Sequence, residues 1–260
     1  MTGKVALKLH TGEPNGPNIL PRPWVQRLQA SIPDSTIVEC NVLYESPRQT
    51  TEGHRETLKA NGWTFCAVDI MDAEGDVSLP VPGGRRLKEV AVGKHLLNYD
   101  SLLALTQFQG ARHGRLRRFA ENIAIGCASG KVGKAQLHRE GNQLWSGGPN
   151  FMERMVEGGK AVTSHFGPHI AYINVLRNMS VSCDCEGVNA APVRCPTWAS
   201  WPPRTSLAVD TASVDMIYAL PKRRAARYGG AHRIRSGLRQ LSYMKEMGMG
   251  QATGMSLITI

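Results

Sequence analysis

The stretch KVALKLH, at Lys4–His10, is β-prone and is followed by a loop rich in Gly and Pro at residues 11–23. A helical segment from about Trp24 to Ile32 comes next. The β-branched run TIVECNV at Thr36–Val42 then precedes a second helical segment, Thr50–Asn61, which opens on threonines. The chain therefore begins with two strand–helix units.

Three more β-prone segments follow, at Thr64–Ile70, Lys88–Val92 and Ser101–Phe108. Because strands alternate with helices, we predict an α/β fold with a mostly parallel, mixed sheet and helices on both faces. We expect one α/β domain over residues 1–260, with strand–helix repeats in 1–108 and a half that bears cysteines and histidines in 109–260. Sites in such sheets form in loops beyond the carboxyl ends of the strands.

Small residues dominate the start of the second half. The stretch GCASGKVGK, at residues 126–134, and the glycines at 147, 148, 158 and 159 indicate loops. His169–Leu176 is expected to form a buried strand that leads into SCDCEG, residues 182–187, while Leu207–Leu220 and Leu238–Met247 have helical spacing.

Charge and hydropathy indicate in which cellular compartment the protein is expected. Lys4 and Lys8 interrupt the N-terminal apolar residues, so the chain lacks the apolar centre of a secretory signal. Charged residues, Gly or Pro break every apolar run before it reaches the roughly 18 residues of a membrane helix. We expect a soluble, cytoplasmic protein with no membrane partner.

The net charge of +10 comes from 31 Lys and Arg against 21 Asp and Glu. The excess of positive charge lies in two stretches, Arg112–Arg118 and Lys222–Arg239. Such basic stretches are typical of proteins that bind a polyanionic partner. These stretches lack interleaved aromatic residues for base stacking and any reader motif, so we disfavour nucleic acid.

The six cysteines suit metal binding better than disulfides in a reducing compartment. Cys183 and Cys185 form a Cys-x-Cys pair that can present two soft ligands to zinc, iron or an iron–sulfur cluster if the chain turns there. Two ordinary buried thiols are the alternative interpretation. Cys40 and Cys66 lie among apolar neighbours and are expected in the core.

Cys127 lies in the small-residue stretch and is followed closely by Lys131, Lys134 and His138. This group is consistent with a ligand shell, an activated thiolate or an anion site, because cations lower the pKa of a thiol and loop amides bind oxyanions. The stretch lacks the spacing of a phosphate-binding loop, and Ala135 stands where such a loop has Ser or Thr.

Five segments together resemble the bacterial and archaeal family called domain of unknown function 362: KVALKLHTGEP at 4–14, NIAIGCASGKVGKAQLH at 122–138, AYINVLRNMSVSCDCEG at 171–187, LAVDTASVDM at 207–216, and residues 241–250. Many members of this family carry a ferredoxin-like pair of four-cysteine clusters after the histidine and are described as iron–sulfur proteins. Here no cysteine occurs between His138 and His165. The resemblance implies a protein linked to a metal or to redox chemistry, in a form without that insert.

Our leading hypothesis is a protein that depends on a metal ion (Fe or Zn) or an iron–sulfur cluster, an oxidoreductase or an electron-transfer protein with a redox partner or a small anionic substrate. Its expected metal ligands are Cys127, His138, Cys183 and Cys185. The residues expected to line an anion or substrate site are Lys8, His10, Glu13, Lys131 and Lys134. A metal-dependent hydrolase with the same ligands and a basic nucleic-acid-binding protein are the alternatives.

Segments 110–122, 194–206, 223–236 and 251–256 depart abruptly from the family pattern and are rich in Arg, Ala, Gly and Pro. A compensated frameshift in GC-rich codons produces such replacements. Under this interpretation much of the net charge, and Cys195 within 194–206, is not a selected feature.

Overall fold

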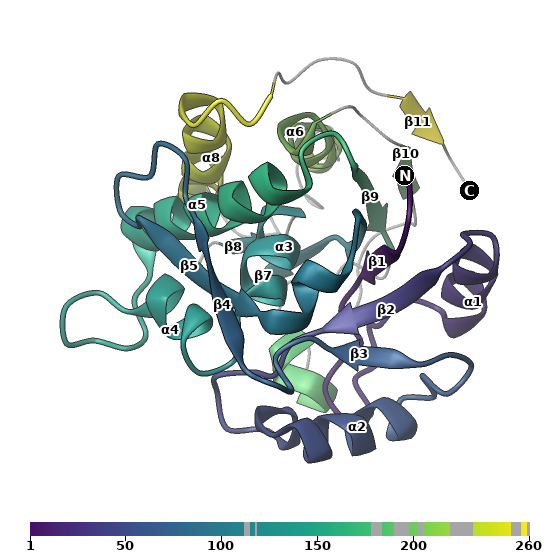
Figure 1. Ribbon diagram of the computed structural model, residues 1–260. Coiled ribbons are helices and arrows are strands. Elements are labelled where there is room, and N and C mark those ends of the chain that lie inside the picture. The colour runs from purple at the N-terminus through teal and green to yellow at the C-terminus, as the bar shows by residue number, and fades with distance from the viewer. Residues whose placement is uncertain are drawn as a thin grey trace.

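The computed structural model describes residues 1–111, 115–117, 119–177, 184–189, 198–201, 205–218, 231–250 and 256–258 (Figure 1). Its main sheet has seven strands in the order β11-β10-β9-β6-β1-β2-β3. The strands are β1 (Val5–Lys8), β2 (Ser35–Glu39), β3 (Val68–Ile70), β6 (Ser101–Gln107), β9 (Ile170–Leu176), β10 (Trp198–Trp201) and β11 (Ser256–Ile258).

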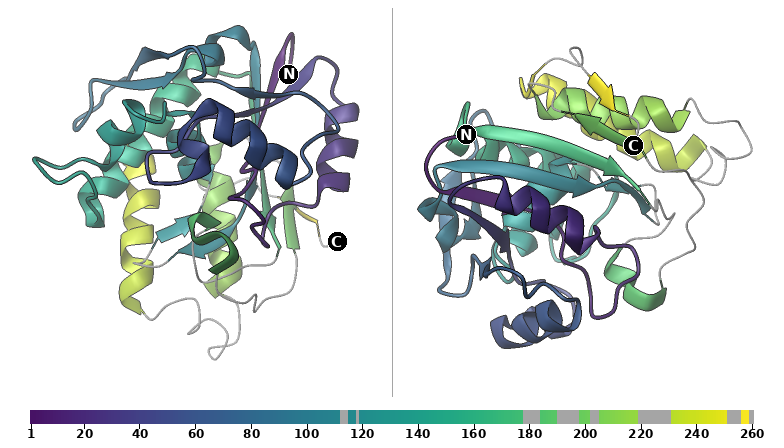
Figure 2. Two further views of the ribbon diagram at one scale, coloured as in Figure 1. Left: turned by 90° about the horizontal axis from the view of Figure 1, so that it is seen from below. Right: turned by 90° about the vertical axis from the view of Figure 1, so that its right-hand side faces the viewer.

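Strands β9, β6, β1, β2 and β3 are parallel to one another, whereas β10 is antiparallel to β9 and to β11 at one edge. Helices α1 (Arg22–Ala30) and α2 (Thr51–Ala60) follow β1 and β2, and helices α3 (Phe119–Cys127), α4 (Gly133–His138), α5 (Gly148–Phe166), α6 (Ser206–Tyr218) and α8 (Ala231–Glu246) belong to the second half. Seen from below in Figure 2, α1 lies on one side of the sheet, and α5 and α8 lie on the other. The predicted α/β class, mixed sheet and two-sided helix cover are confirmed.

The alternation of side chains along the strands explains this two-sided cover. Val5 and Leu7 of β1 point into one apolar cluster with Val25 of α1 and Leu58 of α2. Ala6 points into the other cluster, with buried residues of α3 and α5. Because Lys8 follows Ala6 by two positions, its side chain leaves β1 on the α3 side of the sheet.

The strand predicted at Lys88–Val92 exists as β5 (Glu89–Gly93), but it lies outside the main sheet. It pairs antiparallel with β4 (Asp76–Pro80), a strand that the sequence did not indicate. The other short pair is β7 (Gln109–Ala111) with β8 (Arg115–Arg117), and the 3-10 turns are η1 (Pro47–Gln49), η2 (Lys94–Asn98) and η4 (Asp184–Asn189).

Of the two expected loops, the first is confirmed at 128–132, between α3 and α4, whereas the glycines at 158 and 159 are helical. The stretch at 126–134 contains the end of α3 and the start of α4, and the helix α5 continues through Gly158 and Gly159. A β-carbon at Gly158 would lie 2.8 Å from the side chain of Leu137, so this glycine allows close helix packing. Packing here overrides the low helix propensity of glycine, about 1 kcal/mol per residue.

The strand order reverses between β1 and β6. The chain proceeds from β1 to β2 and β3 on one side, whereas β6 and β9 extend the sheet on the other. Ligands of open α/β sheets bind beyond the carboxyl ends of the strands at such a reversal. None of the described helices is long and apolar enough to cross a membrane.

Candidate functional site

A pocket of about 90 Å³ lies at this reversal point. Its walls come from the carboxyl ends of β1, β2 and β6, from the loop after β2, and from α3, α4 and the loop that follows α4. Charged residues that line it are Lys8, Glu39, Arg48, Glu121 and Lys134. One water needs roughly 10–15 Å³ of such volume, so the pocket has room for several water-sized groups.

Lys8 and Glu39 form a buried ion pair across the ends of β1 and β2. Lys8 Nζ lies 2.8 Å from Glu39 Oε2, and it also donates to the carbonyl of Leu9 (2.8 Å) and to Asn122 Oδ1 (3.3 Å). The three donors of the ammonium group are therefore all used. A β-carbon at Gly126 would lie 2.4 Å from Lys8 Cε, so the glycine of α3 leaves the space that the lysine stem occupies.

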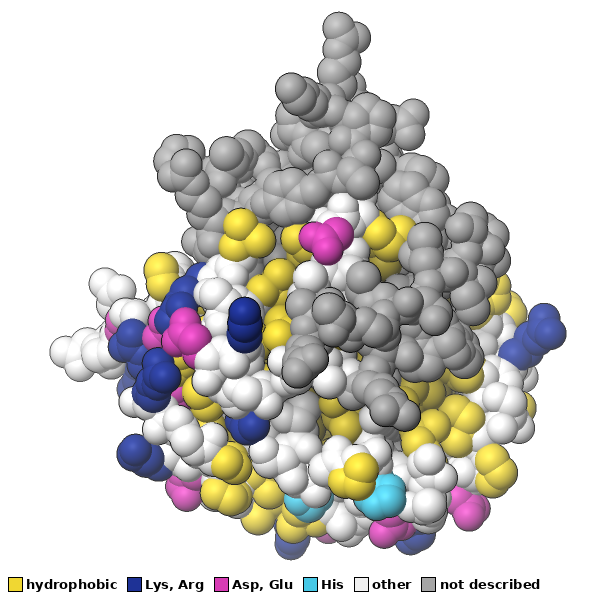
Figure 3. Space-filling view, turned by 90° about the horizontal axis from the view of Figure 1, so that it is seen from above, with side chains coloured by type: hydrophobic (Ala, Val, Ile, Leu, Met, Phe, Trp, Pro, Cys, Tyr) yellow, Lys and Arg dark blue, Asp and Glu magenta, His cyan; other side chains and the backbone are white. Residues whose placement is uncertain are grey.

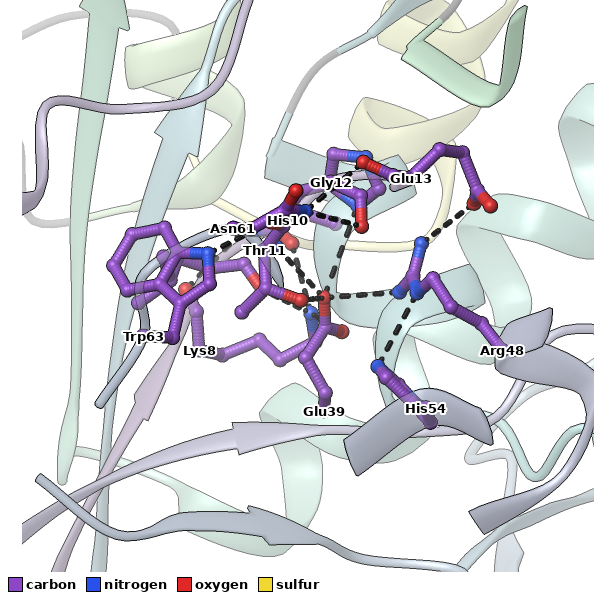
Figure 4. Close-up of polar contacts among 12 residues, drawn as sticks. Lys8, His10, Thr11, Gly12, Glu13, Glu39, Arg48, His54, Asn61 and Trp63 are labelled. Atoms are coloured by element: carbon purple, nitrogen blue, oxygen red, sulfur yellow. Dashed lines mark hydrogen bonds and ion pairs between the residues drawn. The ribbon is translucent and has the colours of Figure 1, made fainter. Parts of the chain in front are cut away.

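Arg48 continues the network on the other side of Glu39 (Figure 4). Its Nη2 donates to Glu39 Oε1 at 3.2 Å, its Nη1 donates to Glu13 Oε1 at 2.8 Å, and its Nε donates to His54 Nε2 at 3.2 Å. Burial alone would raise the pKa of Glu39, but the charges of Lys8 and Arg48, with smaller contributions from His10 and His54, hold that pKa well below its usual range. Glu39 is therefore a carboxylate between two cations.

Asn61 and Trp63 fix the loop after β1 from the far end of α2. The Asn61 amide donates to the carbonyls of Thr11, Gly12 and Glu13 at 3.1, 3.2 and 2.9 Å. The indole of Trp63 donates to Thr11 at 2.8 Å, as Figure 4 shows. Thr11 in turn donates its backbone N–H to Glu39 Oε1 at 2.9 Å. These bonds hold the Lys-x-His loop over the carboxylate.

Lys134 lines the pocket from α4 and differs from Lys8. Its side chain is buried, and its Nζ donates to the carbonyl of Ala128, just beyond the end of α3, at 2.7 Å. Within the described ranges it forms no ion pair. Burial, partly offset by Cys40, Asp72 and Glu39, lowers the pKa of Lys134.

Cys127 is the last residue of α3 and is fully buried in the apolar cluster on that side of the sheet. Burial, partly offset by Lys8 and Lys134, raises the pKa of the Cys127 thiol to about 11. The Cys40 thiol lines the pocket and donates to the Cys127 carbonyl at 3.4 Å, and burial raises its pKa also. Both groups are therefore thiols rather than thiolates at neutral pH.

His138 stacks on Phe151 with a centroid distance of 4.8 Å and meets Trp145 edge to face at 4.9 Å. His138 and Trp145 both line the pocket, and Trp145 is 53% exposed. Trp145 thus forms an aromatic rim at the entrance.

The turn η4 contains the backbone of Cys185 and packs against the loop after β1. A β-carbon at Gly187 would lie 3.4 Å from the β-carbon of Glu13. Cys183 lies outside the described residues, as does Cys195. The turn η4, which holds Cys185, therefore adjoins the Lys-x-His loop.

The structure brings together three of the five residues predicted for an anion site, because Lys8, His10 and Lys134 line one pocket. Glu13 lies behind Arg48 rather than in the lining, and Lys131 is exposed on the surface. In the part of the chain that the structure describes, no three His, Cys, Asp or Glu side chains are arranged to hold a metal ion. The four-ligand set, two of whose thiols are not described, stays a prediction.

Sequence reasoning missed Glu39 and Arg48, the two residues at the centre of the network. One signal was present: Glu39 is a charged residue in the middle of the β-branched run TIVECNV, and an acid in a buried strand needs a partner. No comparable signal marked Arg48, which follows Pro47 in an irregular segment.

The fold and the pocket define an α/β protein with a charged site at the reversal of its strand order. The chain belongs to the family described as Domain of unknown function (DUF362), whose model matches residues 5–215. No curated protein matches the sequence.

Proposed function

We propose that this protein binds and transforms a small anionic molecule in the pocket at the β1–β6 reversal. The observation that carries the proposal is Lys134, a buried cation in the lining that has no ion pair among the described residues. Lys8 and Arg48 each face a carboxylate, Glu39. A bound carboxylate or oxyanion would give the third cation its partner, and an unpaired buried charge is costly.

The size and setting of the pocket support a small ligand. A volume of about 90 Å³ suits a molecule with few heavy atoms rather than a macromolecule. On the face in Figure 3, the Lys and Arg side chains drawn in colour are interspersed with Asp and Glu.

Thermal unfolding in a panel of small anions tests the proposal. Phosphate, sulfate, oxalate and pyruvate are compared with chloride at matched ionic strength, since a ligand at 100 times its Kd adds about 2.7 kcal/mol of stability. We expect at least one anion to raise the Tm of the wild type and to leave that of Lys134→Met unchanged. Equal shifts in both proteins, or none, would contradict the proposal.

A second candidate function is that of a metal- or iron–sulfur-linked oxidoreductase, and the contact between η4 and Glu13 favours it. This contact lies two residues after Cys185 and next to the loop that follows β1. The described side chains do not complete a metal site, so the ligands would have to include Cys183 and Cys185.

Anaerobic purification, metal analysis and an absorption spectrum test this candidate. Bound iron with a broad visible band supports it, whereas stoichiometric colourless zinc supports a metal-dependent hydrolase. Metal that is still bound after Cys183→Ala and Cys185→Ala would rule out this ligand set.

A further inference from the structure

Two buried lysines line the pocket, and their hydrogen bonds separate their roles. Lys8 uses its three donors on Leu9, Glu39 and Asn122, and its charge is balanced by Glu39. Lys134 has one hydrogen bond, to a neutral carbonyl, within the described structure. Lys8 therefore has a structural role. Lys134 can still donate hydrogen bonds to a ligand, and once it is deprotonated its nitrogen lone pair can react with one.

Lys134 is a cation that gives up its proton more readily than an exposed lysine does. The group is buried, and Lys8 and Arg48 line the same pocket. Desolvation disfavours the ammonium form and Lys8 adds to this effect, while the charges of Asp72 and Glu39 partly offset it. Once such a lysine loses its proton, it is a nucleophile toward carbonyl carbons. The lowered pKa of Lys134 agrees with this arrangement.

We propose that Lys134 forms an imine with a small 2-oxo acid bound in the pocket. This inference rests on the proposed function and names its substrate class. The neutral Nζ attacks the carbonyl carbon, a C–N bond forms, and the carbonyl oxygen leaves as water with two protons. The step involves no oxidation or reduction, and no co-reactant.

The remaining lining fits the carboxylate of such a substrate. The lining has three basic side chains, Lys8, Arg48 and Lys134, against two acidic ones, Glu39 and Glu121, so its net charge favours a carboxylate. His10, whose Nδ1 lies 3.8 Å from Glu39 Oε1, and His138 also line the pocket. A 2-oxo acid has both the carbonyl and the carboxylate that these residues require.

Borohydride trapping tests the inference directly. The wild-type protein is incubated with pyruvate and sodium borohydride, and the product is analysed by intact mass and peptide mapping. We expect one reduced pyruvate unit on the peptide that contains Lys134. We expect Lys131→Met, which removes an exposed lysine three positions away, to be labelled like the wild type, and Lys134→Met to lose the label.

Peptide mapping of the wild type decides the question even if Lys134→Met fails to fold. Labelling that is absent, or spread evenly over surface lysines, would overturn the inference. Calorimetric binding of oxalate, which resembles a 2-oxo acid but forms no imine, separates the two proposals. If oxalate binds and pyruvate is not trapped, only the imine fails; if neither binds, both proposals fail.

Discussion

The carboxylate of Glu39 lies 2.8 Å from the ammonium nitrogen of Lys8, and both side chains are almost fully shielded from water, at 3% and 2% exposed. The pair joins the ends of β1 and β2 next to the reversal of strand order. A buried ion pair is often no more stabilising than apolar residues of similar volume. Its position therefore points to a role in shaping the pocket.

Removing the charge of Glu39 should be strongly destabilising. Glu39→Gln leaves Lys8 and Arg48 with less buried counter-charge, and breaking such a pair costs about 3–5 kcal/mol. Urea unfolding measures the loss. The matched control is Glu56→Gln, whose pair with Lys59 is 66–67% exposed and should contribute about 0–1 kcal/mol. Equal losses in the two variants would contradict the assignment.

His54 should make stability fall as the pH falls. Arg48 Nε donates to His54 Nε2, so this ring nitrogen accepts and the imidazole is neutral. Burial, together with the charge of Arg48 and despite that of Glu39, lowers the pKa of His54 to about 3. As the pH falls, His54 is protonated in the unfolded chain before it is protonated in the folded protein. The contribution of His54 to folding stability is therefore complete above about pH 6.5 and is lost progressively down to about pH 3.

The free energy of unfolding against pH tests this assignment. Between about pH 6.5 and 4.5, we expect the wild type to lose up to roughly 1.4 kcal/mol per pH unit more than His54→Gln. Glu39 adds little in this range, because its pKa is lowered and the unfolded value lies near 4.5. Parallel curves for the two proteins would show that His54 does not titrate as described.

His95 should have the opposite effect to His54, so that its contribution to stability is lost as the pH rises. Its Nδ1 lies 2.8 Å from Asp69 Oδ1, and this hydrogen bond, against partial burial, raises the pKa of His95. The stabilisation is complete below about pH 6.5 and is lost as the pH rises through the raised value. His95→Gln should therefore cost more stability near pH 5.5 than near pH 9. A loss independent of pH would contradict this.

The thiols should differ in reactivity. Cys127 and Cys40 are buried with raised pKa values, whereas Cys66 is half-buried. Because the thiolate is the reactive species, iodoacetamide should modify Cys66 first and reach Cys40 and Cys127 only after unfolding. Peptide mapping over time measures the order. Fast modification of Cys127 in the folded protein would instead support its role as a metal ligand.

Most of the first half of the fold could be predicted from sequence because its main-sheet strands and its two α-helices each have their own periodic signal, whereas β4 has none. Lys4–His10 and Thr50–Asn61 correspond to β1 and α2 within a few residues. The second half was harder, because the glycines of α5 suggest a loop and become helical only when Leu137 and Ile123 pack against them. Such contacts depend on the tertiary structure.

Only part of the candidate site could be predicted from the sequence, because the rest of it also depends on tertiary contacts. Lys8 and His10 lie in the Lys-x-His motif, and Lys134 lies in the small-residue stretch at 126–134. Glu39 and Arg48 join them only because the parallel register aligns Lys8 with Val38 and brings the loop after β2 across the end of β1. Spacing along the chain does not encode that juxtaposition.

Isothermal titration of the folded protein with oxalate, beside Lys134→Met and the surface control Lys131→Met, tests the central claim most directly. We predict that the wild type and Lys131→Met bind one oxalate per chain with similar affinity. We predict at least about tenfold weaker binding by Lys134→Met, since a charge-assisted hydrogen bond contributes roughly 1.5–3 kcal/mol. Equal affinity in all three proteins would contradict the assignment of this pocket as an anion site, as would the absence of binding by the wild type.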